Sequence, residues 1–140
     1  MTARCFVDTN IFFYALGKSS FSKKVAANRL LDGMIRPVIN GQVIRELVYN
    51  LRKKAGYGEE DVREVIRQLH LDCEVMADHE TLFQQASLLR EEQAVSYWDS
   101  LIMAAALAAG CDTLYSEDMQ HGQRIAGTLR IINPFWTESD

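Results

Sequence analysis

The sequence predicts an α/β fold, in which a mainly parallel sheet of four or five strands has helices on both faces. Short β-branched runs alternate with longer segments of helical periodicity, a pattern typical of βα units. Of the 140 residues, 48% are hydrophobic and only 2 are proline, so the chain can form a sizeable core with few interruptions. No repeat, linker or change of composition divides residues 1–140, which we expect to form a single domain.

The first half of the chain is expected to form two strands and three helices. The strands are residues 4–7 and 37–39, and the helices are residues 22–34, 42–54 and 59–69. In each helical segment, apolar residues recur at the spacing of an amphipathic helix. Asn40 stands where its side chain can cap the second of these helices.

The second half is expected to add three strands and two helices. The strands are residues 73–76, 113–115 and 129–132. Asp78 is expected to cap a helix that runs through Leu89. Ser96 opens the second helix, 97–109, which is apolar nearly all round and should therefore be the central buried helix. Gly110 then ends that helix.

The composition excludes several classes of protein. The longest apolar run, Leu101–Ala109, is shorter than the ~18 residues of a membrane helix. Asp8 interrupts the first apolar residues too early for a secretory signal. The 3 cysteines are widely spaced and form no CxxC motif, which argues against a zinc site and a disulfide framework. We therefore expect a soluble, cytoplasmic protein without a membrane partner.

The charges are distributed unevenly along the chain. Residues 1–70 carry 12 Lys and Arg against 7 Asp and Glu, whereas residues 71–140 carry 3 against 12. A basic half and an acidic half suit a protein that docks a polyanion on one surface and holds metal ions on another. The alternative is that both sets of charges only solvate helix faces, and charge alone favours this alternative.

Two acidic residues follow predicted strands. Asp8 ends strand 4–7, and Asp118 comes shortly after strand 113–115. In parallel sheets, ligands bind beyond the carboxyl ends of the strands, where both side chains would lie. A carboxylate at the tip of a buried strand loses solvation unless a cation compensates its charge. Taken singly, each residue is equally well explained as a helix cap or a turn residue.

Two further acidic residues lie on predicted helices. Glu46 borders the apolar stripe of its helix, and Asp99 forms a capping box with Ser96. Each has a sufficient structural explanation alone. Four carboxylates at one edge of a sheet, however, repel one another unless cations hold them. Because the chain offers no Cys and His ligand set, Mg²⁺ or Mn²⁺ is the expected ion, and two such ions could clamp a phosphodiester.

Four segments, in this order and spacing, resemble the PIN-domain ribonucleases. They are Phe6-Val7-Asp8-Thr9-Asn10, Glu46 in a helix after a short strand, Tyr97-Trp98-Asp99-Ser100-Leu101-Ile102, and Leu114-Tyr115-Ser116-Glu117-Asp118-Met119-Gln120-His121-Gly122. The resemblance covers essentially the whole chain. The length also resembles the toxins of VapBC-type toxin–antitoxin modules.

This resemblance implies a three-layer α/β/α sandwich and an endonuclease that hydrolyses RNA, such as tRNA or rRNA, with Mg²⁺ or Mn²⁺ and metal-activated water. It also implies a small cognate antitoxin and a homodimer. Asp8 would be the central metal ligand, and Asp99 and Asp118 would complete the metal shell. Glu46 would bind the metal directly or through water.

Three further residues match positions near these ligands. Ser116 matches a hydroxyl that can orient a metal-bound water. Asn10 would bond Asp8 or a substrate phosphate, although a role in the turn is an equal alternative. Glu117 stands where the family varies, so it is left outside the ligand set.

Other residues are candidates for contact with RNA. Arg52, Lys53 and Lys54 form a basic run that could bind phosphates, and the alternative is a solvated helix face. Tyr97 and Trp98 could stack on bases. Because they begin a buried helix, we expect them to be packing residues instead.

Two rival functions belong to other classes. A receiver-type phosphoacceptor domain also has an acidic residue after its first strand, but its chemistry needs a lysine near the last strand, and none follows Lys54. A non-catalytic RNA-binding scaffold with a PIN-like fold would bind RNA without degrading it. His121 lies near Asp118, but hydrolysis through metal ions does not require it.

Overall fold

The computed structural model describes residues 3–17 and 20–138. In chain order, its elements are β1 Cys5–Val7, α1 Thr9–Leu16, α2 Phe21–Asp32, β2 Val38–Asn40, α3 Gly41–Ala55, α4 Glu59–Asp72, β3 Glu74–Met76, α5 Glu80–Glu92, α6 Tyr97–Ala108, β4 Thr113–Tyr115, β5 Arg124–Ile125 and β6 Leu129–Ile132. Within the described ranges, no helix has the length and hydrophobicity needed to cross a membrane.

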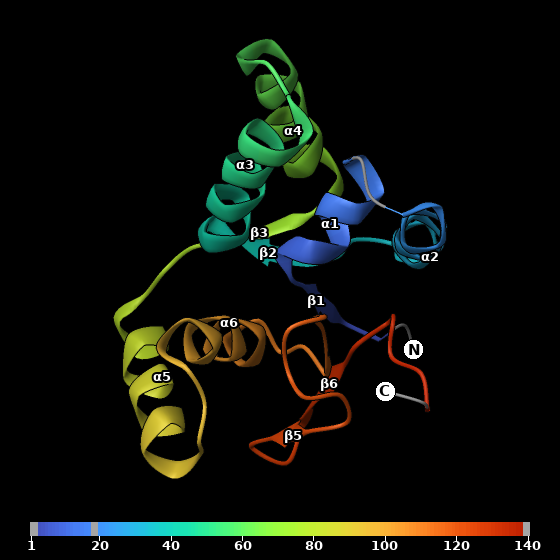
Figure 1. Cartoon of the computed structure of the whole chain (residues 1–140). Helices are drawn as coiled ribbons and strands as arrows, with labels where there is room; N and C mark the ends of the chain where they lie inside the picture. Colours follow the sequence, from blue (N-terminus) through green and yellow to red (C-terminus); the bar gives the residue numbers. More distant parts are fainter. Residues whose placement is uncertain (1–2, 18–19, 139–140) are drawn as a thin grey trace.

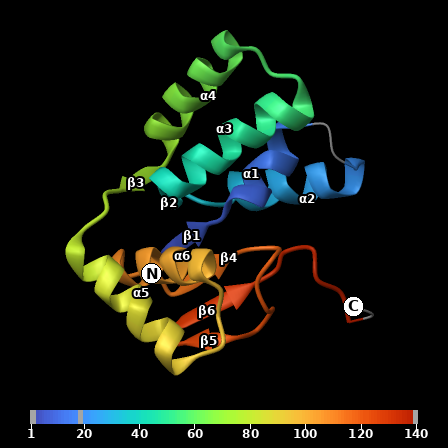
Figure 2. The same cartoon turned by 60° about the vertical axis from the view of Figure 1, so that its left-hand side comes forward.

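The strands form one twisted sheet in the order β3-β2-β1-β4-β6-β5. All neighbouring strands run parallel except β5, which is antiparallel to β6. Helices α1–α4 lie on one side of the sheet, and α5 and α6 lie side by side on the other (Figures 1 and 2). The predicted α/β fold with both faces covered is therefore confirmed.

The expected number of strands was too low. Five of the strands in the described part were expected, and the additional one is β5. It has only two residues and pairs through Ile125 with Leu129. Two residues are too few to show the alternation of polar and apolar side chains that predicts a strand.

The core lies on both faces of the central strands. Phe6 in β1, Ile39 in β2 and Leu114 in β4 are fully buried. Helix α6 buries Ile102–Ala106, as expected for the central helix. Gly110 follows it with a φ of 72°, a left-handed conformation that glycine adopts without strain.

The sequence pattern did not predict α1, which begins at the residue after Asp8. Ile11 and Phe12 are buried, so this short helix packs its apolar side chains into the core. A second correction concerns α5. His79, not Asp78, occupies the position before its first turn, and the His79 side chain makes no capping hydrogen bond.

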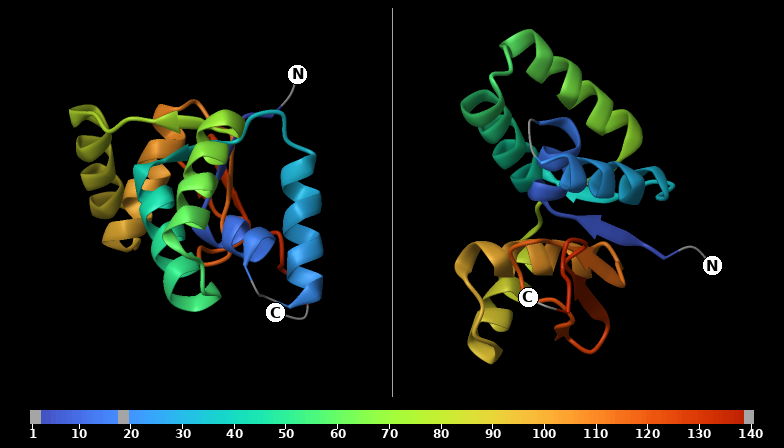
Figure 3. Two further views of the ribbon diagram at one scale, coloured as in Figure 1. Left: turned by 90° about the horizontal axis from the view of Figure 1, so that it is seen from above. Right: turned by 45° about the vertical axis from the view of Figure 1, so that its right-hand side comes forward.

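The chain reverses its direction across the sheet beside β1. From β1 the chain moves outward through β2 to β3, and it then returns through α5 and α6 to β4, on the other side of β1. The segment after β3 makes this return by passing from one face to the other (Figure 3). In α/β proteins, ligands bind beyond the carboxyl ends of the strands at such a reversal.

Candidate active site

Asp8 follows β1 directly, at the point where the chain reverses its direction across the sheet. Its backbone N–H donates to the Tyr115 carbonyl over 2.9 Å, which joins the ends of β1 and β4. Its Oδ1 accepts from the Thr9 N–H at 2.8 Å, and its Oδ2 accepts from the Ser116 hydroxyl at 2.9 Å. Asp8 is only 9% exposed. The carboxylate therefore caps α1 and is held in one orientation.

The environment of Asp8 disfavours its negative charge. Burial is the main cause that raises the pKa of the Asp8 carboxyl to about 6. The two hydrogen bonds from Thr9 and Ser116 oppose this increase, whereas the charges of Glu46 and Asp118 add to it. A buried carboxylate near other carboxylates is a site that a cation would stabilise.

Glu46 lies on α3 and contacts the residue that follows Asp8. Asn40 caps this helix by accepting from the Val43 N–H over 3.2 Å, as predicted. One Glu46 oxygen accepts from the Thr9 hydroxyl at 3.0 Å, and the other accepts from the Gln42 amide at 3.2 Å. Thr9 therefore links the side chain of Glu46 to the residue that follows Asp8.

Thr9 and Gln42 were not among the predicted site residues. Gln42 has a local signal, because it stands four residues before Glu46 and such pairs face each other on a helix. The contact of Thr9 with Glu46 joins two elements, so no sequence pattern reports it.

Asp118 and Asp99 come from the part of the chain that forms α6 and β4, and β4 lies on the other side of β1 from β2. Asp118 follows β4, and its Oδ2 accepts from the Asn10 amide at 2.9 Å. Burial and the charge of Glu117 raise the pKa of Asp118, the Asn10 bond lowers it, and the charges of Asp99 and Glu46 raise it. Asp99 lies in the first turn of α6, where its N–H donates to Ser96 as predicted.

The four predicted carboxylates, Asp8, Glu46, Asp99 and Asp118, are linked by the effects of their charges on the pKa values of Asp8 and Asp118, and we call them the carboxylate cluster. In residues 3–17 and 20–138, no Lys or Arg forms an ion pair with any of them. The same ranges contain no group of three or more acidic, His or Cys side chains arranged closely enough to hold a metal ion. These side chains lie within electrostatic range of one another rather than at coordination distance.

A known protein family matches most of this chain. The family model described as PIN domain matches residues 5–125, which include the whole carboxylate cluster. This chain belongs to the PIN domain family. No curated protein sequence is similar enough to this chain to count as a match.

Solved structures share the PIN fold along most of the chain. A toxin–antitoxin complex from Klebsiella pneumoniae has a TM-score of 0.71 at 18% identity, covering 95% of this chain and 98% of that one. VapBC2 from Rickettsia felis, bound to a promoter DNA fragment, has a TM-score of 0.66 at 22% identity, with coverages of 95% and 98%. VapC20 from Mycobacterium tuberculosis, a sarcin–ricin loop cleaving toxin, has a TM-score of 0.62 at 24% identity, with coverages of 79% and 86%.

Glu117 of this PIN domain is adjacent to Asp118 but, unlike the cluster residues, forms an ion pair. Lys23 of α2 donates to its Oε2 over 2.7 Å, and the Tyr14 hydroxyl donates to its Oε1. The Lys23 ammonium also lies over the Tyr14 ring, 4.6 Å from its centre, and 5.5 Å from the centre of the Phe135 ring. These contacts form what we call the Lys23–Glu117 clamp.

His121 has a structural role. Its Nδ1 accepts from the Asn133 N–H over 3.0 Å, and its ring stacks on Trp136 with the centres 4.4 Å apart. These contacts fasten the segment after β6 to the loop after β4.

The basic run at the end of α3 lies away from the cluster. At about 1.5 Å per residue, Lys53 is roughly 10 Å further along the helix than Glu46. Arg52 donates to the Tyr57 carbonyl over 2.9 Å and lies 3.7 Å from Glu59, while the Lys53 ammonium lies over the Tyr49 ring.

The expectation that Tyr97 and Trp98 pack in the core is wrong. Tyr97 is 53% exposed and Trp98 is 63% exposed. Both belong to the first turn of α6, and the buried residues of this helix begin with Ser100.

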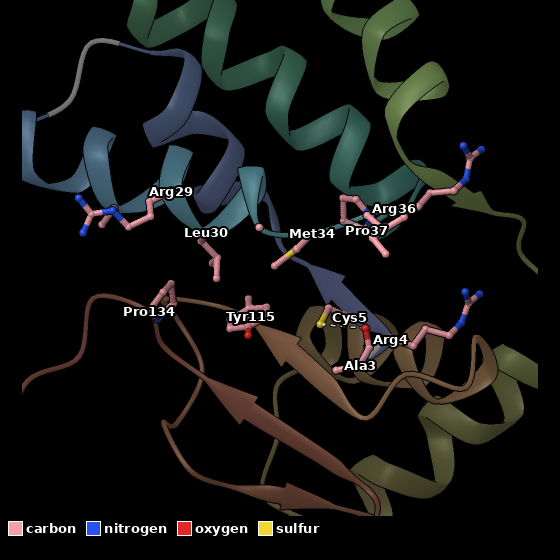
Figure 4. A pocket seen from close by; sticks show the side chains of 13 residues that line it. Ala3, Arg4, Cys5, Arg29, Leu30, Met34, Arg36, Pro37, Tyr115 and Pro134 are labelled. Carbon is pink, nitrogen blue, oxygen red and sulfur yellow. Dashed lines mark hydrogen bonds between the residues drawn. The ribbon is translucent and has the colours of Figure 1, made fainter. Parts of the chain in front are cut away.

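A cavity of about 790 Å³ lies between α2 and the start of β1, and none of the four cluster residues lines it. Its lining is mostly apolar and includes Leu30, Met34 and Tyr115. Three arginines stand at its margins, but Figure 4 shows their guanidinium groups pointing in different directions. They do not converge on a single anion-binding point.

Proposed function

We propose that this PIN domain is an endoribonuclease that depends on Mg²⁺ or Mn²⁺ and is the toxin of a VapBC-type pair. The observation that carries the proposal is the buried Asp8 carboxylate, on which the charges of Glu46 and Asp118 act and which has no paired cation among the described residues. A site of four carboxylates and no sulfur or imidazole ligand fits a hard divalent ion.

Asp8, Glu46, Asp99 and Asp118 would hold the metal. Such an ion activates water and neutralises charge on a phosphodiester. Glu46 and Asp118 are exposed, so their side chains could adjust to a bound metal ion without a change in the backbone. Glu46 lies on α3 and Asp99 lies on α6, so two of the four carboxylates are carried by helices, which keeps the site ordered.

Neighbouring polar groups orient these ligands. The Ser116 hydroxyl donates to Asp8, the Asn10 amide donates to Asp118, and the Thr9 hydroxyl donates to Glu46. Each donor satisfies one carboxylate oxygen and leaves the other carboxylate lone pairs for a cation. Asn10 would therefore act on Asp118, which is neither of the partners expected from the sequence.

RNA such as tRNA or rRNA is the proposed substrate. Arg52, Lys53 and Lys54 remain candidate contacts for its phosphates. The similar structures named above include an RNA-loop cleaving toxin and two complexes with an antitoxin or promoter DNA, which supports a cognate antitoxin as partner. A homodimer in the cytoplasm completes the proposal.

The test is RNA cleavage by the purified chain with Mg²⁺, with Mn²⁺ and with EDTA. Cleavage should require a divalent ion and should disappear in Asp8→Asn protein purified in the same way. RNA that is bound but not degraded under all conditions would favour the non-catalytic scaffold. Equal cleavage by the variant would show a contaminating nuclease or a different catalytic centre.

A further inference from the structure

Two large aromatic side chains are exposed at the start of α6. Tyr97 and Trp98 contact each other edge to face, with ring centres 5.0 Å apart and an angle of 89° between the planes. Exposure of a Tyr–Trp pair leaves apolar surface in water, and such surface commonly marks a site of interaction.

The Tyr97 ring is supported from behind. The Arg90 guanidinium of α5 lies over this ring, 4.9 Å from its centre. Arg90 also donates to the buried Ser100 hydroxyl over 2.8 Å, and that hydroxyl donates to the Tyr97 carbonyl over 2.6 Å. The Tyr97 ring is therefore held in place before a ligand binds, so it loses little side-chain freedom on binding.

The aromatic pair stands at the rim of the carboxylate cluster. Trp98 directly precedes Asp99, and its carbonyl accepts from the Gln42 amide over 3.4 Å. The same Gln42 amide donates to Glu46. The backbone at Trp98 therefore lies close to Glu46, and Asp99 is the next residue in the chain.

We propose that Tyr97 and Trp98 form a platform on which an unpaired RNA base stacks while the adjoining phosphate approaches a divalent ion held by the carboxylate cluster. The proposal rests on the proposed nuclease function. Stacking suits an RNA occupant because every base has an aromatic face, and the Arg90 charge favours a polyanion over a neutral peptide. A base inside a duplex is already stacked on its neighbours and cannot use the platform.

Binding to a cleavage-deficient chain tests the platform directly. In the double variant Asp8→Asn with Trp136→Phe, Trp98 is the only tryptophan and reports on its own surroundings. A short single-stranded RNA of mixed sequence, added with Mg²⁺, should quench its fluorescence. The same strand annealed to its complement should quench it much less.

Substitutions separate stacking from general apolar contact. In the Asp8→Asn chain, Trp98→Leu should weaken single-stranded RNA binding about tenfold, whereas Trp98→Phe, which keeps a ring, should weaken it less than about threefold. Tyr97→Leu provides a second test at the neighbouring ring. Leu71→Ala is the control, because Leu71 is 57% exposed at the end of α4, near the opposite edge of the sheet.

The kinetics of the otherwise unchanged chain distinguish the two proposals. Trp98→Leu should raise KM for single-stranded RNA and leave kcat nearly unchanged. If the parent chain cleaves RNA and Trp98→Leu alters neither KM nor binding, the platform is wrong and the nuclease stands. If the parent never cleaves but Trp98 still controls RNA binding, the nuclease is wrong. Loss of antitoxin binding alone in Trp98→Leu would make the rings a protein contact and overturn the platform.

Discussion

The residues after β4 contain two adjacent carboxylates in opposite situations. Glu117 has 19% of its side chain exposed and is compensated by the Lys23 ammonium and the Tyr14 hydroxyl. Asp118 receives one amide hydrogen bond from Asn10 and faces the other acids of the cluster. The clamp resembles an ordinary structural ion pair, whereas the cluster retains unbalanced negative charge.

The two regions differ in whether the fold compensates the charge of a carboxylate. A fold can compensate a carboxylate with a lysine from a neighbouring helix, as α2 does for Glu117. At the cluster, the described residues provide hydroxyl and amide donors, which orient the carboxylates without cancelling their charge. Negative charge kept in this way costs stability, and the proposed metal ion would compensate it.

The sharpest way to break this contrast is to neutralise each of the two adjacent acids. Asp118→Asn should lower RNA cleavage by about a hundredfold or more, because a metal ligand contributes several kcal/mol to the transition state. Glu117→Gln should keep cleavage within about threefold, because Glu117 belongs to the clamp. Initial rates at saturating Mg²⁺ measure both. Equal losses in the two variants would erase the distinction.

The charge of Asp8 should make the metal-free protein less stable as the pH rises. The folded protein holds the Asp8 proton up to a pKa of about 6, whereas an unfolded carboxyl loses it near 3.8. Stability from this group is therefore full below about pH 4 and falls as the pH rises through 6, by about 2–3 kcal/mol.

Denaturant unfolding in EDTA from pH 4 to pH 8 measures this effect. Asp8→Asn should remove most of the pH-dependent loss and should be more stable than the parent at pH 7. If the variant is less stable than the parent at pH 7, the Asp8 charge does not strain the metal-free fold.

The smallest effect should come from the clamp. Lys23→Met should lower the free energy of unfolding by about 1 kcal/mol, since a half-exposed ion pair and a cation–π contact each contribute modestly. Lys24→Met is the matched control on the same helix, and it should stay within about 0.5 kcal/mol of the parent. A larger loss in the control than in Lys23→Met would show that the clamp is not what holds α2.

Local patterns predicted most of this fold. The periodic helices, the Asn40 and Ser96 caps and the Gly110 stop all depend on residues close in sequence. Helix α1 was missed because it follows β1 directly, and a run of apolar residues there fits either a helix or a strand.

The candidate site was predictable only in outline. Parallel strands bring Asp8 and Asp118 to one edge of the sheet, so their proximity follows from the fold class. The bonds of Thr9 to Glu46 and of Asn10 to Asp118 join distant segments and depend on the packing of α1. The exposure of Trp98 depends on which turns of α6 are covered by the rest of the fold, and periodicity does not report this.

Calorimetric titration of the metal-free chain with Mn²⁺ tests most directly whether the four carboxylates form one site. The parent should bind Mn²⁺, and the variants Asp8→Asn, Glu46→Gln, Asp99→Asn and Asp118→Asn should each bind it at least about tenfold more weakly. Glu117→Gln should stay within about threefold of the parent. If any of the four cluster variants binds Mn²⁺ as tightly as the parent, the carboxylates do not share a metal, and the account is contradicted.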